Sequence, residues 1–281
     1  FVFHDAKVSI SYESYSFTPM KNLLSPITSI LDDACYAMSF LDDGLETFPI
    51  SEYVMQSLFL KMTGFQEQKV KCILWELATD DYELRYRRFK KDSISEASAY
   101  SDKMKVFNDL AKATKALQPK GAVLFTDVEL DDIMNSTFLF LDNFNKQRFM
   151  KGWASRQYNE YKKLFKFCNK ECLLFSKGET YEIFNHCDCC KRKSKANDES
   201  LCKRCTLKKA YEFVYKHRNR CAHNTVSYQQ NLPSLEKLQD ENYVFENYFI
   251  RFALLIIIDK MFVSLFKKYI NFSPKNFDLY G

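Results

Sequence analysis

Residues 218–223 bring together an arginine, an amide and a histidine that could act on one phosphate ester. Arg218 can donate two hydrogen bonds to phosphate oxygens and never loses its charge, whereas a histidine such as His223 titrates near neutral pH. On a helix, Asn219 and His223 are four residues apart and share a face, so the amide could hold the imidazole in one orientation. We therefore predict Arg218, Asn219 and His223 as catalytic residues, with Arg220 and Lys216 as substrate-binding residues.

RNA would supply its own nucleophile to such a site. Its 2′-hydroxyl needs only a group that takes the proton and cations that hold the charge growing on the phosphate. The expected reaction is a metal-independent cut that leaves a 2′,3′-cyclic phosphate. Arg218 lies about 140° around the helix from His223, so one copy does not easily bring the two together. Two copies that meet near the small Ala222 across a two-fold axis can, which predicts a homodimer with its active site at the interface.

The string from Lys216 to Asn224 resembles the signature of the HEPN family of ribonucleases, and the resemblance covers about residues 205–270. In that family an arginine, a following polar residue and a histidine four to six positions after the arginine lie in a helical bundle, and two copies commonly face each other. The corresponding residues here are Arg218, Asn219 and His223. The resemblance implies an endoribonuclease that acts as an effector of a prokaryotic antiviral defence or toxin system, and it allows for a regulatory partner protein.

The same residues also allow interpretations without catalysis. Arg218, Arg220 and His217 would form a basic helix end that suits the helix dipole, with His223 as a core or capping residue. His217 has no amide one turn before it, so we leave it out of the catalytic set. The alternative function is a non-catalytic, zinc-containing RNA-binding or protein-interaction module. A third possible function is that of an accessory subunit that binds a small nucleotide between protomers.

Four cysteines in two Cys-x2-Cys pairs predict a structural zinc site. The pairs are Cys187/Cys190 and Cys202/Cys205, with eleven residues between them. Each pair can place two thiolates on one ion, and four thiolates complete a tetrahedral shell that leaves no position for water. The zinc would hold a small insertion together, and no catalytic metal is expected. Cys189 or His186 could replace a neighbouring ligand.

Positive charge is concentrated around these two motifs. Residues 185–224 hold eleven Lys and Arg against four Asp and Glu, a net charge of +7, while the whole chain carries +5, so the remainder carries −2. A local basic patch favours a polyanionic partner such as RNA. Clustered cysteines indicate metal binding in a reducing cytoplasm rather than disulfides, and the absence of an apparent signal peptide agrees. The apolar run at 252–258 is too short to span a membrane, so no membrane partner is expected.

The predicted fold class is all-α: a HEPN-like helical bundle with a small zinc-binding insertion. The chain has only six glycines and six prolines, which are too few turn-forming residues for a β-sandwich or barrel. Residues 1–20, around Val8, Ile10 and Tyr12, could form a short strand or an extended arm. We divide the chain into an N-terminal helical region packed on the bundle (1–180), the zinc-binding insertion (181–206) and C-terminal HEPN-like helices that carry the motif (207–281).

Capping residues and apolar periodicity place the individual helices. In the first half of the chain, helices are expected from Ser25 to Gly44, over 51–77, from Asp80-Asp81 into the basic segment 85–91, and from the Ser93/Glu96 capping box to Leu117. Further helices are expected to begin at the Thr126/Glu129 capping box, to run through Tyr158 and Tyr161, and to cover 207–225. Tyr158 and Tyr161 are expected to be core residues. Asn231–Ser234 should open a last helix of roughly thirty residues, which is apolar on every face at 252–258. The basic segment 85–91 is interpreted as a solvated helix face, with an RNA-backbone contact as the alternative.

Several enzyme classes are excluded by motifs that the chain lacks. It contains no Walker A string, no dinucleotide-binding glycine turn, no His-Glu-x-x-His zincin helix and no nucleophile elbow.

Overall fold

A computed structural model of the chain describes residues 23–39, 48–89, 97–147, 150, 155–164, 207–223 and 247–273. The regular elements among these residues are all helices: α2 (Ser29–Ala37), α3 (Phe48–Asp80), α4 (Tyr82–Phe89), α5 (Tyr100–Leu117), α6 (Asp127–Asn145), α7 (Ser155–Leu164), α9 (Leu207–His223) and α11 (Tyr248–Phe272). The all-α prediction is confirmed for this part of the chain. The predicted N-terminal strand or arm and the predicted zinc-binding insertion lie outside the described residues.

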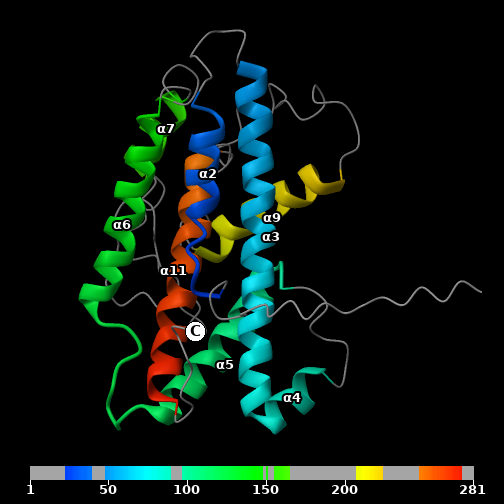
Figure 1. The fold of residues 1–281 in the computed structure, drawn as a ribbon, viewed down its shortest axis with the longest axis vertical. Coiled ribbons are helices and arrows are strands. Elements are labelled where there is room, and N and C mark those ends of the chain that lie inside the picture. Colours follow the sequence, from blue (N-terminus) through cyan, green and yellow to red (C-terminus); the bar gives the residue numbers. More distant parts are fainter. Residues whose placement is uncertain are drawn as a thin grey trace, which may run out of the picture.

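The last helix, α11, runs through the middle of the bundle and packs against α3, α5, α6, α7 and α9 (Figure 1). Residues 252–258 are at most 1% exposed. A helix that is apolar on every face needs neighbours on every side, and α11 has them. The prediction that this run lies between other helices is therefore confirmed. Helices from before residue 165 and from after residue 206 share one hydrophobic core, while the predicted domain boundaries stay a prediction.

A buried ion pair joins the two longest helices. Nζ of Lys69 on α3 and Oδ1 of Asp259 on α11 are 2.6 Å apart, and both side chains are 2% exposed. Nearby, Nε2 of Gln66 donates to the backbone oxygen of Leu255 across the same helix pair. Burial opposes charge on both partners: it raises the pKa of Asp259 and lowers that of Lys69, and each charge counters the shift of the other. The pair therefore fixes the register of α3 against α11 at a cost in desolvation.

The same ion pair explains why the first described helix starts later than predicted. Oδ2 of Asp259 accepts from the backbone N–H of Ile27, and Nζ of Lys69 donates to the backbone oxygen of Ser25. These contacts hold the chain in a turn at 26–28, so α2 begins at Ser29 and not at Ser25. The predicted end at Gly44 is also wrong, because α2 ends at Ala37.

The predicted starts of two other helices, α5 and α11, are also wrong. α5 begins at Tyr100, after the Ser93/Glu96 capping box, because Lys103 donates to the backbone oxygens of Ala97 and Ser98 and keeps them outside the helix. α11 begins at Tyr248 and not near Ser234. Its N-cap is Asn247, whose side-chain oxygen accepts from the backbone N–H of Phe249.

The sequence correctly predicted two helix caps and the burial of two tyrosines. The Thr126/Glu129 capping box is present at the start of α6, and Oδ1 of Asp81 caps α4 by accepting from the backbone N–H of Leu84. Tyr158 and Tyr161 on α7 are buried, as predicted. Within the described helices, none combines the length and apolarity that a membrane crossing requires.

Candidate functional site

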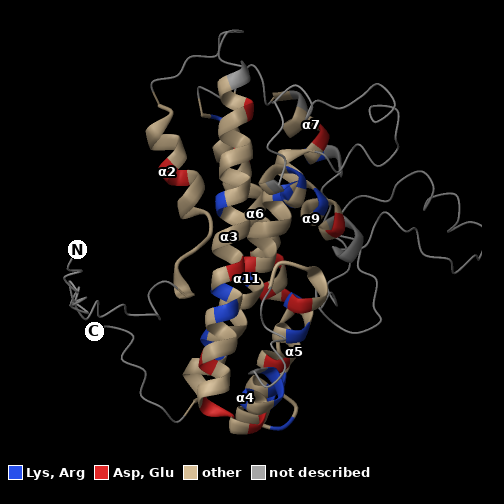
Figure 2. Cartoon of the chain, turned by 90° about the vertical axis from the view of Figure 1, so that its right-hand side faces the viewer, with Lys and Arg blue, Asp and Glu red and all other residues tan. Residues whose placement is uncertain are grey.

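The motif lies at the C-terminal end of α9, which crosses α3 and α11 near the middle of the bundle (Figure 1). Tyr211, Val214 and His217 are buried and face the core, because residues three apart on a helix share a side. Lys216 and Ala222 are exposed. Figure 2 shows basic residues on this helix. The helix thus divides the motif between a core-facing set and a solvent-facing set.

Two of the three predicted catalytic residues are in direct contact. Nη1 of Arg218 donates to Oδ1 of Asn219, 3.0 Å away. Nη2 of Arg218 also lies 3.7 Å from Oε2 of Glu67 on α3, and the arginine side chain is 29% exposed. A partly exposed ion pair at this distance is weak, of order 0.2–1 kcal/mol. Arg218 is therefore held in one orientation but remains reachable from solvent.

The third predicted catalytic residue, His223, is the last residue of α9. Its side chain lies outside the described residues, so the expected contact between Asn219 and His223 stays a prediction.

The other histidine of the motif helix, His217, is buried among aromatic rings. Its ring centroid is 5.0 Å from that of Phe59 on α3 and 5.7 Å from that of Tyr248 on α11. Burial, and then the charges of Arg251 and Arg220, lower the pKa of His217 to about 2. The imidazole is therefore neutral at physiological pH, which agrees with leaving it out of the catalytic set.

Arg220 sets the tautomer of this imidazole. Nη2 of Arg220 lies 2.8 Å from Nδ1 of His217, and a guanidinium can only donate, so Nδ1 accepts. The ring proton of the neutral imidazole then sits on Nε2, which faces Sγ of Cys221 at 3.4 Å. Burial raises the pKa of the Cys221 thiol. The pair is thus neutral, and it lacks the thiolate that a nucleophilic cysteine needs.

The two predicted substrate-binding residues differ in orientation. The guanidinium of Arg220 is turned toward His217, on the core side of the helix. Lys216 is exposed, with Nζ 5.8 Å from the ring centroid of Phe213. Of the two, Lys216 is the one whose charge faces solvent.

Sequence reasoning missed a charged cluster beneath the motif. Arg251 on α11 is 2% exposed, and its guanidinium carbon lies 5.1 Å from the ring centroid of Tyr248. The Tyr248 hydroxyl donates to Oε1 of Glu52 on α3. Burial raises the pKa of Glu52, while the Tyr248 hydrogen bond and the charge of Arg251 lower it. The available signal was one cation, Arg251, directly before the apolar run at 252–258.

A buried lysine lies on the other side of α9. Lys103 is 1% exposed, its Nζ donates to backbone oxygens on the approach to α5, and it sits 5.2 Å from the ring centroid of Tyr211. Burial lowers the pKa of Lys103 to about 7, with Glu67 raising it and Arg218 lowering it. The pair formed by Arg218 and Glu67 therefore acts electrostatically on a group that titrates near neutral pH.

The predicted zinc ligands Cys187, Cys190, Cys202 and Cys205 lie outside the described residues, as do Cys189 and His186. Among the residues that are described, no three His, Cys, Asp or Glu side chains lie close enough to hold a metal ion. Comparison with protein-family models, curated proteins and solved structures found no match for this chain. Membership of the HEPN family therefore stays a proposal that depends on the motif residues of α9.

Proposed function

We propose that this protein is a metal-independent endoribonuclease of the HEPN type and an effector of a prokaryotic antiviral defence or toxin system. The observation that carries the proposal is the placement of Arg218. Its guanidinium is oriented by Asn219, partly open to solvent, and on the same helix end as His223. His217 is neutral and buried, which makes His223 the histidine of this helix that could serve as a base.

The proposed reaction needs no group beyond these side chains and the RNA. The neutral imidazole of His223 takes the proton of a 2′-hydroxyl, whose oxygen forms a bond to the adjacent phosphorus. The bond from phosphorus to the 5′-oxygen breaks, and that oxygen takes up the proton that the His223 imidazolium then holds. Arg218 donates to the phosphate oxygens as charge grows on them. Oδ1 of Asn219 accepts from Arg218 and has a second lone pair, which could accept the ring N–H of His223 and leave the other ring nitrogen free to act as the base.

A homodimer would complete this site. Arg218 and His223 are five residues apart, about 140° around the helix, so the arginine of one protomer would act with the histidine of its partner. Ala222 is exposed between them in sequence and is small enough to let two copies of α9 approach. The predicted structural zinc, held by the four cysteines, would support the segment that leads into α9.

Cleavage of a mixed RNA pool tests the catalytic proposal. The wild type, His223→Ala and Arg218→Ala are compared with metal chelated after folding and with dimerisation measured by light scattering. Removal of a general base or a phosphate-binding arginine should slow cleavage by about 100-fold or more. Arg85→Ala is the matched control, because Arg85 is a solvent-exposed arginine on α4 that lies over the Trp75 ring, away from α9. Equal cleavage by His223→Ala and the wild type would overturn the proposal.

The alternative function is a non-catalytic RNA-binding or protein-interaction module built on the zinc segment. The observation in its favour is that Glu67 already pairs with Arg218, so a phosphate must compete with a carboxylate there. This alternative predicts that the wild type binds RNA, leaves it whole, and loses binding in parallel with zinc.

A further inference from the structure

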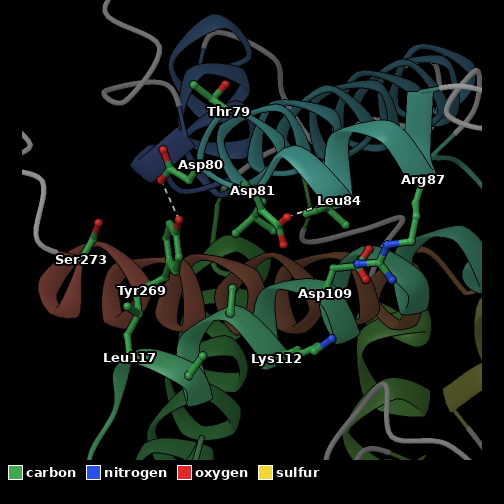
Figure 3. Close-up of a pocket in the computed structure, with 13 residues that line it drawn as sticks. Thr79, Asp80, Asp81, Leu84, Arg87, Asp109, Lys112, Leu117, Tyr269 and Ser273 are labelled. Carbon is green, nitrogen blue, oxygen red and sulfur yellow. Dashed lines mark hydrogen bonds between the residues drawn. The ribbon is translucent and has the colours of Figure 1, made fainter.

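A pocket of about 480 Å³ opens at the end of the bundle where α3, α5 and α11 end and α4 begins (Figure 3). Its volume lies within the range of about 300–1,000 Å³ that is typical of small-molecule sites. It is formed inside one chain, far along α3 from the motif helix. Residues from the end of α3 and from α4, α5 and α11 line it.

One side of the pocket is cationic. Arg87 and Lys112 line it, and neither forms an ion pair or a hydrogen bond with another residue in the described part of the chain. The carboxylate of Asp109 also lines the pocket, but it is already engaged, because Nε and Nη2 of Arg88 both donate to its Oδ2. Two cations beside one cavity, whose side chains pair with no other described residue, are suited to an anionic group, and above all to a phosphate.

The opposite side offers acceptors. The hydroxyl of Tyr269 donates to Oδ2 of Asp80, 2.7 Å away, and Oδ1 of Asp81 caps α4. Figure 3 shows Asp80 and Tyr269 at the end of the pocket away from Arg87. Three helices also end here, and the carbonyl ends of helices carry negative partial charge. Hydroxyl and amino groups of a ligand would find their acceptors at this end.

Between the two ends the wall is apolar. Leu77 and Leu84 are buried, and Ala113 and Ala116 of α5 present small side chains beside them. An apolar wall with small side chains can accommodate a flat or apolar part of a ligand. The order along the pocket is therefore an anion site, an apolar surface and a set of acceptors.

We propose that this pocket binds a nucleoside monophosphate, with its phosphate at Arg87 and Lys112, its base against the leucine and alanine wall, and its hydroxyl or amino groups at Asp80 and Asp81. The inference is independent of the proposed ribonuclease activity, since the residues and the helix ends differ from those of the motif. It assigns the protein a small regulatory ligand of stated chemistry.

Calorimetric titration of the full chain with AMP, GMP, CMP and UMP tests this proposal, with adenosine as the probe that lacks the phosphate. Saturable binding of at least one nucleotide is expected, and adenosine should bind at least tenfold more weakly than AMP if AMP is a ligand. Arg87→Ala and Lys112→Ala should each weaken nucleotide binding about tenfold or more. The matched controls are Arg85→Ala on the same turn of α4 and Lys115→Ala on α5, which do not line the pocket.

A second variant distinguishes the pocket from the surface charge around it. Ala116→Trp adds a large side chain at the exposed edge of the wall, and it should abolish binding while the thermal unfolding midpoint stays close to that of the wild type. The proposal is overturned if no nucleotide binds at millimolar concentration, or if Arg87→Ala and Ala116→Trp bind as the wild type does. Binding of AMP and adenosine with equal affinity would also overturn it, because the anion site would then be unused.

Discussion

Arg220 donates a hydrogen bond from Nη2 to Nδ1 of His217, 2.8 Å away, so two basic residues one turn apart share a buried position with only one of them charged. The burial of His217 and the charges of Arg251 and Arg220 keep the imidazole neutral. The ring contacts with Phe59 and Tyr248 then join α9 to α3 and α11. A residue that resembles a catalytic histidine by type is thus a structural one.

The stability of the protein should fall in mild acid because of His217. The folded-state pKa of His217 is about 2, below the ordinary histidine pKa of 6.5, so the unfolded chain takes up a proton below about pH 6.5 and the folded protein does not. Above pH 6.5 this group has no effect; at pH 5 it should reduce the free energy of unfolding by roughly 2 kcal/mol. Urea unfolding of the wild type and His217→Gln at pH 7 and pH 5 measures the difference. An equal loss in both proteins would contradict the burial of a neutral imidazole.

Removal of the carboxylate beside Arg218 should strengthen RNA binding. Glu67 lies 3.7 Å from Arg218 and also pairs with Lys71. Glu67→Gln removes a competitor for the guanidinium and should tighten RNA binding about two- to fivefold at low salt, as expected for a weak ion pair. Fluorescence anisotropy with a labelled RNA measures this, with Glu76→Gln on the same helix as the control. Weaker binding by Glu67→Gln would mean that the carboxylate positions Arg218 instead.

Replacing only one residue of the buried Lys69–Asp259 pair should destabilise the protein much more than replacing both. Lys69→Met leaves the Asp259 carboxylate buried without its partner and should cost about 3–5 kcal/mol of unfolding free energy. Lys69→Met combined with Asp259→Asn removes both charges and keeps an acceptor for the backbone N–H of Ile27. Chemical denaturation should show that the double variant recovers most of the loss. Equal instability of the two variants would show that the ion pair itself is needed.

The four paired cysteines should bind one zinc ion per chain. Cys202→Ser removes one thiolate of the predicted tetrahedral shell, and zinc measured by mass spectrometry should fall well below one equivalent. Cys72→Ser is the matched control, because Cys72 is an exposed cysteine on α3, outside the cysteine cluster, and its replacement should leave the zinc in place. Retention of full zinc by Cys202→Ser would remove this residue from the ligand set.

The sequence predicted those features of the fold that depend on neighbouring residues. The Thr126/Glu129 capping box and the Asp81 cap form because donor and acceptor are three residues apart. The burial of residues 252–258 followed from an apolar run without a polar face. In contrast, the helix starts at Ser29 and Tyr100 depend on Asp259 and Lys103, whose contacts with these segments are set by packing. Local capping rules therefore named the wrong residues there.

For the candidate site, the sequence alone determined that Arg218, Asn219 and His223 share the end of one helix, because helical spacing is a local property. Only the tertiary structure decided that His217 faces the core, that Arg220 turns toward it, and that Glu67 reaches Arg218 from another helix. It also brought Glu52 and Tyr248 together across 196 positions of the chain. Such contacts depend on how three helices pack, and side-chain burial then sets which groups stay neutral, so no spacing along the chain could specify them.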